Sequence, residues 1–399
     1  MLTFRVEGDA YERGLQQAKQ FGPQALVEAR DALANLAVMP KAMPAWLKGP
    51  LTSGLVGSLG RLWYGRHAKT LRAYEGGRFH RMLEGLSAGF GAPVRKLYGF
   101  AAFELEASRF NYTLGCTSFA FAGEATAFGR PLIAYNHDFP PQFAAFVAVR
   151  ESVPDEGFPS VAVTYPPMMG TMCGVNAAGL AVSLNHAWVR RLSAQAALPI
   201  SLLVQDVLDR CADVEEALEV FRATPVPNGS MATLCDAGGG RAVAELTPAG
   251  VFVRRTKGPV LHTFNAYQTD GARRLEVPIG AVGAGPIKGM DIHGPNLARQ
   301  ARYDALGVAA QAKWSAAQID ALMADHGGGE PGVNTICRHV DSHAETLISA
   351  RVDPIERTLV VAHGFACTAK PVVYRVPSAA VGSSRQDVGS RDAPAPAAA

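Results

Sequence analysis

The tetrapeptide Gly115-Cys116-Thr117-Ser118 stands where a helical pattern gives way to short apolar runs. If the chain breaks before Cys116, the new α-amine has an ordinary pKa of about 7.7–8.0, and the thiol has one of about 8.5. One residue then holds both the nucleophile and its base. Gly115 suits such a break because a residue without Cβ tolerates a strained backbone. On its own, the tetrapeptide favours a buried structural cysteine.

Three more polar residues stand at the ends of expected strands. Asp138 closes the segment 136–138, 22 residues after Cys116, where a carboxylate could hold or orient an α-amine. Asn185 ends the second strand of an expected hairpin, and Asn265 follows another strand. A side-chain amide in such a place can donate a hydrogen bond to an oxyanion. Alone, Asp138 is equally typical of a turn, and each Asn is more often a turn or cap residue.

Helices and short strands must position these residues. Residues 10–108 are rich in Ala, Leu, Gln and Glu and are predicted to be helical, with a loop near 39–59. Further helices are predicted at 199–211, 214–223, 295–306 and 316–325. Apolar runs between turn residues predict strands at 117–121, 132–136, 146–151, 160–165, 180–185, 231–236, 241–246, 251–254, 260–263, 346–352, 358–363 and 372–376. This order indicates layered α and β structure with antiparallel sheets.

The composition excludes several classes of protein. The chain has 399 residues and a net charge of +3, which is too weak to indicate nucleic acid or a membrane surface as a partner. No apolar run approaches the roughly 18 residues of a membrane helix. The first residues lack a signal-peptide pattern, so we expect a cytoplasmic protein. The six cysteines include no CxxC pair and are predicted to be reduced thiols.

The order of the motifs resembles the acyl-coenzyme A:6-aminopenicillanic acid acyltransferase family of autoproteolytic cysteine enzymes. These are N-terminal-nucleophile (Ntn) hydrolases, and the chain is more distantly similar to bile salt hydrolases and penicillin V amidases. The resemblance spans roughly residues 4–376. The segments that carry it are, in order, 8–14, 115–117, 136–138, 174–180, 263–265, 301–306, 346–351, 353–354 and 359–364.

This resemblance implies a fold and a division of the chain. The fold is a four-layer αββα Ntn-hydrolase sandwich, an α+β architecture of antiparallel sheets flanked by helices, over residues 116–377. Residues 1–115 form a helical pro-segment that becomes the small subunit after cleavage between Gly115 and Cys116. Residues 378–399 are rich in Ser, Ala, Pro and Gly and are predicted to be disordered.

The resemblance also implies roles for single residues. Cys116 matches the nucleophile, and Asp138 matches the acid that contacts its amine. Asn185 and Asn265 match the amides that hold the oxyanion and orient the amine, although Asn265 fits only with one inserted residue. Arg302 matches a site arginine that could stabilise carboxylate or oxyanion charge. A surface position on a helix is the alternative for Arg302.

The substrate would be bound around the nucleophile. His137 stands where many family members have an aromatic residue. Apolar loops follow Asp138 and precede the hairpin, and they could form the wall of an acyl pocket. The expected substrate-binding residues are Asn136, His137, Phe139, Met168 and Met169. These loops could equally be packed over the core.

The expected activity is acyl transfer or hydrolysis through an acyl-Cys116 intermediate. The substrates are small-molecule acyl amides or acyl thioesters, coenzyme A thioesters among them. A strict N-acyl amide hydrolase and a non-catalytic small-molecule-binding relative are the alternatives. The chain should run as two bands if it cleaves itself and as one if it does not.

No metal or redox cofactor is expected. The pair His137 and Asp138 could be imagined as metal ligands, as could His339 with Asp341 and His343. We expect instead that residues 337–339 lie on a late core strand.

Overall fold

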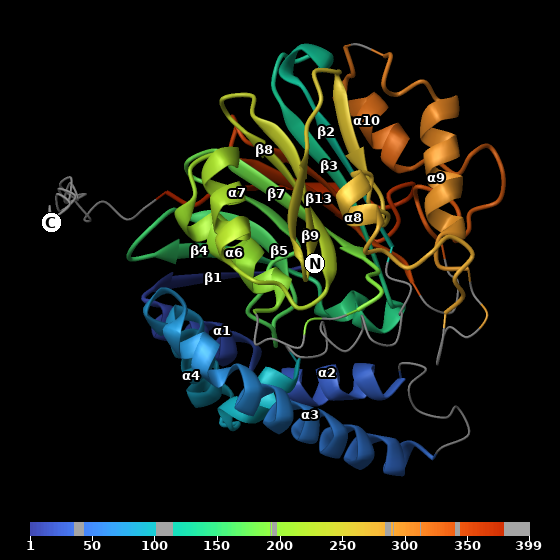
Figure 1. Ribbon diagram of the computed structural model, residues 1–399. Helices are drawn as coiled ribbons and strands as arrows, with labels where there is room; N and C mark the ends of the chain where they lie inside the picture. Colours follow the sequence, from blue (N-terminus) through green and yellow to red (C-terminus); the bar gives the residue numbers. More distant parts are fainter. Residues whose placement is uncertain are drawn as a thin grey trace, which may run out of the picture.

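The computed structural model describes residues 1–35, 44–100, 115–191, 193, 198–283, 289, 291–311, 313–339 and 344–378. Two sheets form its centre (Figure 1). The larger sheet has the order β1-β4-β5-β6-β7-β8-β9-β10, and the smaller has the order β11-β2-β3-β12-β13-β14. Within the described residues, every neighbouring pair is antiparallel except β1 and β4, which are parallel.

The strands are short and mostly buried. Those of the larger sheet are β1 Leu2–Gly8, β4 Ala148–Pro154, β5 Ser160–Thr164, β6 Cys173–Asn176, β7 Leu180–Ala187, β8 Gly229–Asp236, β9 Arg241–Thr247 and β10 Gly250–Arg254. Those of the smaller sheet are β11 Val260–Thr263, β2 Gly115–Phe121, β3 Leu132–Phe139, β12 Glu345–Asp353, β13 Thr358–His363 and β14 Pro371–Arg375.

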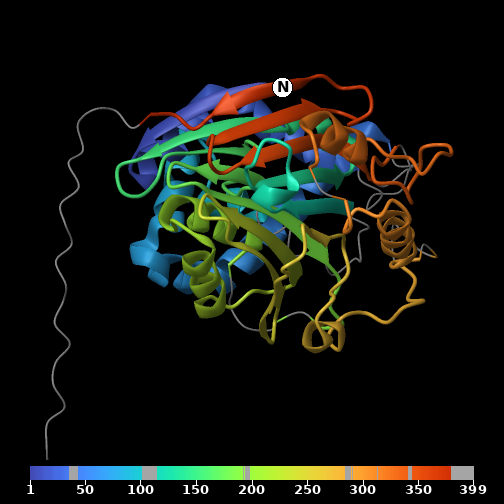
Figure 2. The same cartoon turned by 90° about the horizontal axis from the view of Figure 1, so that it is seen from above.

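The two sheets pack face to face, with helices outside each. Helices α6 (Ile200–Arg210) and α7 (Val214–Ala223) cover the larger sheet, while α9 (Gly294–Ala305) and α10 (Ala316–Met323) cover the smaller one. Seen from above, the red C-terminal strands lie at the side of the molecule opposite the yellow-green helices α6 and α7 (Figure 2). The predicted four-layer αββα sandwich is therefore confirmed.

The N-terminal segment packs against one end of the sandwich (Figure 1). Its helices include α1 (Ala10–Phe21), α2 (Gln24–Asn35), α3 (Ala45–Ala73) and α4 (Arg78–Phe90). The sequence did not predict β1, whose partner residues on β4 lie 146 positions further along the chain. Residues 101–108 of the predicted helical region and 379–399 of the predicted tail lie outside the described residues.

Glycines let α1 and α4 approach closely. A Cβ on Gly14 would overlap the carbonyl oxygen of Met82, and a Cβ on Gly85 would overlap that of Tyr11. The backbones of the two helices therefore touch where these glycines lie.

The segment 8–14 ties the N-terminal helices to the sandwich. The Asp9 side chain accepts a hydrogen bond from the backbone N–H of Glu12, and the Glu12 carboxylate accepts one from the backbone N–H of Asp9, which is a capping box. The buried Arg13 donates to Ser152 at 3.0 Å and to Asp209 at 3.2 Å. The motif thus begins α1 and anchors it on β4 and α6.

Candidate active site

Cys116 is the second residue of β2, and its thiol lies between the two sheets. The residue is 3% exposed and pairs directly with His137 on β3. Its Sγ lies 3.5 Å from the Tyr135 hydroxyl oxygen and 3.7 Å from His137 Nδ1. The strand end thus brings the predicted nucleophile and the predicted substrate-binding histidine together.

Two tyrosines determine the hydrogen bonds of His137. Tyr135 donates its hydroxyl proton to the Leu184 carbonyl oxygen at 2.7 Å, so the Tyr135 oxygen accepts from His137 Nδ1 at 2.9 Å. His137 Nε2 then accepts from the Tyr165 hydroxyl at 2.8 Å. Burial lowers the pKa of His137 to about 3, so the imidazole is neutral. Sequence reasoning missed both tyrosines.

The thiol is not ionised at neutral pH in the uncleaved chain. Burial raises the pKa of Cys116 to about 11. The charge of the nearby Asp138 carboxylate also raises this pKa, whereas the Tyr135 hydrogen bond and Arg299 lower it. A base is therefore needed before this cysteine can attack a carbonyl carbon.

The backbone nitrogen of Cys116 has a side-chain partner. It donates to Asn265 Oδ1 at 2.8 Å, and Arg299 Nη2 donates to the same oxygen at 2.8 Å. Asn265 Nδ2 in turn donates to the His186 carbonyl oxygen at 2.8 Å. These three contacts fix the orientation of the Asn265 amide.

Arg299, and not the predicted Arg302, contacts Cys116 in the structure. Arg299 Nη1 donates to the Cys116 carbonyl oxygen at 2.7 Å and to Thr117 Oγ1 at 3.0 Å. The Arg302 side chain is 32% exposed and forms a bidentate pair with Asp325 at 2.7 and 2.8 Å. Both arginines lie on α9, but Arg302 lies about 4.5 Å further along its axis.

Asp138 and Gly115 lie opposite each other on β3 and β2. Asp138 Oδ1 accepts from Thr346 Oγ1 at 2.7 Å, and Oδ2 lies 3.9 Å from Arg299 Nη1. A Cβ on Gly115 would overlap Arg338 Nη1 and Asp138 Oδ2. Glycine is therefore required by the closeness of two buried side chains, and Gly115 is not among the glycines with positive φ.

Asn185 links the two sheets in this state. Its Oδ1 accepts from Ser118 Oγ at 2.6 Å, and its Nδ2 donates to the Phe264 carbonyl oxygen at 2.9 Å. Ser118 also contacts Ser183 Oγ at 2.9 Å. The predicted oxyanion donor is thus already engaged by backbone.

Asn136 does not lie with the other predicted substrate-binding residues. Its Nδ2 donates to the carbonyl oxygens of Met323 at 2.8 Å and Ile336 at 2.9 Å, on the outer face of the smaller sheet. Side chains alternate between the faces of a strand, so Asn136 points away from the face that His137 shares with the thiol. Its role here is to anchor α10 and the segment that follows it.

Of the residues predicted to form an apolar wall, Phe139 lies beside His137. The Phe139 ring stacks on the imidazole at 5.3 Å between centroids. Gln17 on α1 donates to the Met168 carbonyl oxygen at 2.9 Å, and the buried Arg150 donates to that of Met169 at 2.9 Å. Met168 is half-buried, and Met169 is buried in the core.

A cavity of about 630 Å³ opens beside Asn265. Its lining includes the neighbours Phe264 and Ala266, together with Asn296 and Glu276, but not Cys116. Burial raises the pKa of Glu276 to about 8, and its Oε1 accepts from the backbone N–H of Tyr267 at 3.0 Å. Sequence reasoning missed this carboxyl group.

Parts of this chain align with solved structures of low sequence identity. The Caenorhabditis elegans N-acylethanolamine-hydrolyzing acid amidase ortholog is 13% identical, covers 60% of this chain and 93% of its own, and has a TM-score of 0.39. A variant of the conjugated bile acid hydrolase from Clostridium perfringens is 13% identical, covers 69% of this chain and 100% of its own, and has a TM-score of 0.37. Penicillin V acylase from Agrobacterium tumefaciens is 17% identical, covers 65% of this chain and 84% of its own, and has a TM-score of 0.35.

The family assignment comes from the sequence. No curated protein matches the chain, and none of the described helices is both long and apolar enough to cross a membrane. The model of the family described as acyl-coenzyme A:6-aminopenicillanic acid acyl-transferase matches residues 126–365, which is more than half of the chain and begins after Cys116. The chain belongs to this family.

Proposed function

We propose that this protein cleaves itself between Gly115 and Cys116 and then uses Cys116 to transfer acyl groups from small acyl amides or thioesters. One observation carries the proposal. The sulfur, backbone nitrogen and carbonyl oxygen of Cys116 each have a polar side-chain partner, from Tyr135, Asn265 and Arg299 respectively. An ordinary core cysteine on a strand needs no such set.

Cleavage would begin with attack of Cys116 Sγ on the Gly115 carbonyl carbon. The thiol proton passes to the departing backbone nitrogen as the peptide C–N bond breaks and a thioester forms. Water then hydrolyses the thioester, which leaves a carboxyl group on Gly115 and a free α-amine on Cys116. The buried Arg338 and Asp138 stand directly beside this bond.

After cleavage, the α-amine is a better base for the thiol than His137. The pKa of His137 is about 3 and that of the thiol about 11, so proton transfer between them costs on the order of 10 kcal/mol. An α-amine with a pKa of about 7.7–8.0 reduces this cost to a few kcal/mol. His137 therefore serves better as a neutral wall of the pocket.

Asn265 is the better placed oxyanion donor. Only one of its N–H groups is used, toward His186, and no other described residue accepts from the second. Asn185 would first have to release the Phe264 carbonyl oxygen. A donor held in place before the reaction stabilises developing charge without reorganising.

The two products of cleavage should remain together as subunits. β1 is a strand of the larger sheet, and the ion pairs of the buried Arg13 and the partly buried Arg78 with the buried Asp209 join the N-terminal segment to α6. A coenzyme A thioester as acyl donor and an amine as acceptor fit the family description. A strict N-acyl amide hydrolase would use the same acyl-Cys116 intermediate with water.

Mass spectrometry under denaturing conditions tests the proposal. The protein should separate into residues 1–115 and 116–399, and a shift in the mass of the larger piece after exposure to an acyl donor would report the acyl-enzyme. Cys116→Ala should stop both events, whereas Cys235→Ala, at another buried cysteine, should stop neither. An active but uncleaved chain would refute self-cleavage.

A further inference from the structure

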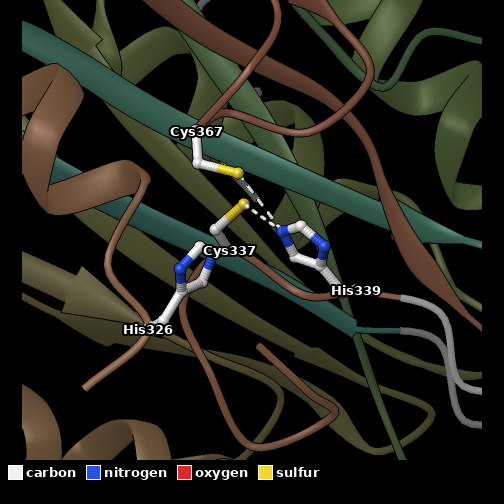
Figure 3. Close-up of side chains that lie close together, drawn as sticks. All are labelled: His326, Cys337, His339 and Cys367. Atoms are coloured by element: carbon white, nitrogen blue, oxygen red, sulfur yellow. Dashed lines mark hydrogen bonds between the residues drawn. The ribbon is translucent and has the colours of Figure 1, made fainter. Parts of the chain in front are cut away.

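Four side chains of metal-ligand type meet on the outer side of the smaller sheet. They are His326, Cys337, His339 and Cys367, and their ligand atoms all lie within 4.8 Å of one another. Figure 3 shows both sulfur atoms converging on the same nitrogen of His339, at 3.7 Å from Cys337 and 3.2 Å from Cys367. The group lies outside the catalytic arrangement described above.

These separations fit a tetrahedral zinc ion. With Zn–S bonds of about 2.3 Å and Zn–N bonds of about 2.0–2.1 Å, sulfur and nitrogen ligands lie about 3.5 Å apart. The two measured S···N distances are close to this value. The rings of His326 and His339 have centroids 4.9 Å apart and are turned by 80°, so the two imidazoles do not stack.

His326 provides an independent observation. Its Nε2 atom is fully buried, and no described residue forms a hydrogen bond with it. A buried polar nitrogen without a partner is costly, and coordination to a cation would remove that cost.

The surrounding contacts hold the ligands in place. His326 follows Asp325, whose carboxylate pairs with Arg302 and whose carbonyl oxygen accepts from the backbone N–H of Cys337 at 3.1 Å. Cys367 comes from the turn between β13 and β14. The Arg302–Asp325 pair thus anchors the segment that carries His326 to α9.

We propose that these four residues bind one structural zinc ion. Two thiolates and two imidazoles complete the tetrahedral shell and leave no open position for a substrate, as in structural rather than catalytic zinc sites. The two thiols lose their protons to solvent on binding, so the bound group carries no net charge.

The zinc site would stabilise the end of β2, the strand that carries Cys116. In the sequence, Arg338 lies between the ligands Cys337 and His339, and its guanidinium lies beside Gly115. Its backbone N–H donates to Thr346 Oγ1 at 2.9 Å, and that hydroxyl donates to Asp138. Zinc would hold this segment against the end of β2. The binding itself does not depend on the proposed function.

Metal analysis of the full-length protein, purified under reducing conditions and supplied with zinc, tests the proposal. We expect about one zinc per chain. Cobalt(II) added to the chelator-treated protein should give the intense visible bands of tetrahedral thiolate coordination. Cys367→Ser and His339→Asn should each lose most of the metal. Cys211→Ser and His363→Asn should keep it, since neither residue belongs to the cluster.

Cys367 is exposed, so its serine variant should fold, and a melting curve checks this. A folded wild-type protein that binds neither zinc nor cobalt would overturn the proposal, whether or not the chain cleaves itself. So would a Cys337–Cys367 disulfide that persists under the reducing conditions, or equal metal loss in the control variants.

Discussion

Replacing Arg299 by glutamine should slow self-cleavage strongly while the same change at Arg302 should not. Arg299 is fully buried and donates to the oxygens of Pro295, Cys116, Thr117, Asn265 and Asn296. Glutamine has one amide group and no charge, so it cannot replace this fork. Among the described residues, the Arg302 guanidinium forms one ion pair, its partly exposed pair with Asp325.

The expected losses of stability and of cleavage rate differ between Arg299→Gln and Arg302→Gln. Removing one partner of a buried charge pair costs about 3–5 kcal/mol of stability, because Asp138 would remain buried beside fewer cations. Asn265 would also lose one of the donors that orient its amide, and loss of an oxyanion donor typically slows a reaction about 10²–10³-fold. An exposed pair such as that of Arg302 contributes about 0–1 kcal/mol.

Cell-free synthesis followed by denaturing electrophoresis would give the cleavage rate of each newly made chain. Melting temperatures of the purified variants would separate loss of fold from loss of rate. We expect Arg299→Gln to cleave about 10²–10³-fold more slowly than wild type, and Arg302→Gln to cleave within a few-fold of it. A folded Arg299→Gln variant that cleaves at the wild-type rate would refute this reasoning, as would an equal loss in Arg302→Gln.

Two further changes have definite expected outcomes. Asn265→Ala should lower kcat about 10²–10³-fold in folded, cleaved enzyme. Asn185→Ala should mainly lower the melting temperature, because the Asn185 amide joins the two sheets. If kinetics and melting showed the reverse, the roles of Asn265 and Asn185 would have to be exchanged. Glu276→Gln should stabilise the protein more at pH 8 than at pH 5. Burial raises the pKa of Glu276 from 4.5 to about 8, so wild-type stability falls as pH rises across that interval, by at most about 5 kcal/mol. Unfolding measured at both pH values should show this difference, and an identical gain would contradict it.

Local patterns predicted layered α and β structure with antiparallel sheets and most of the strands, and the family resemblance supplied the four-layer sandwich. The expected strand at 346–352 is β12, and the expected hairpin is β6 and β7. These strands are short apolar runs bounded by turns, which is a local signal. β1 was not predicted because its pairing with β4 joins segments that are distant in the sequence.

The positions that differ from the sequence-based expectation have physical causes. Arg299 and Arg302 lie on the same helix, and a helical pattern does not reveal which turn faces the site. The alternation of a strand could have excluded Asn136, because a residue adjacent to His137 must point to the opposite face. Residues 337–339 lie in a loop rather than on the expected core strand.

The contacts of Cys116 suggest why one arrangement could serve both cleavage and turnover. Before cleavage, its nitrogen donates as an amide to Asn265 Oδ1 at 2.8 Å. After cleavage the same atom would be an amine and could donate to the same oxygen, which Arg299 keeps in place from the other side. Asn265 would therefore not need to turn between the two reactions. A base that is already oriented loses little entropy when it takes the thiol proton, so the geometry that guides the first cut would also prepare the enzyme that the cut creates.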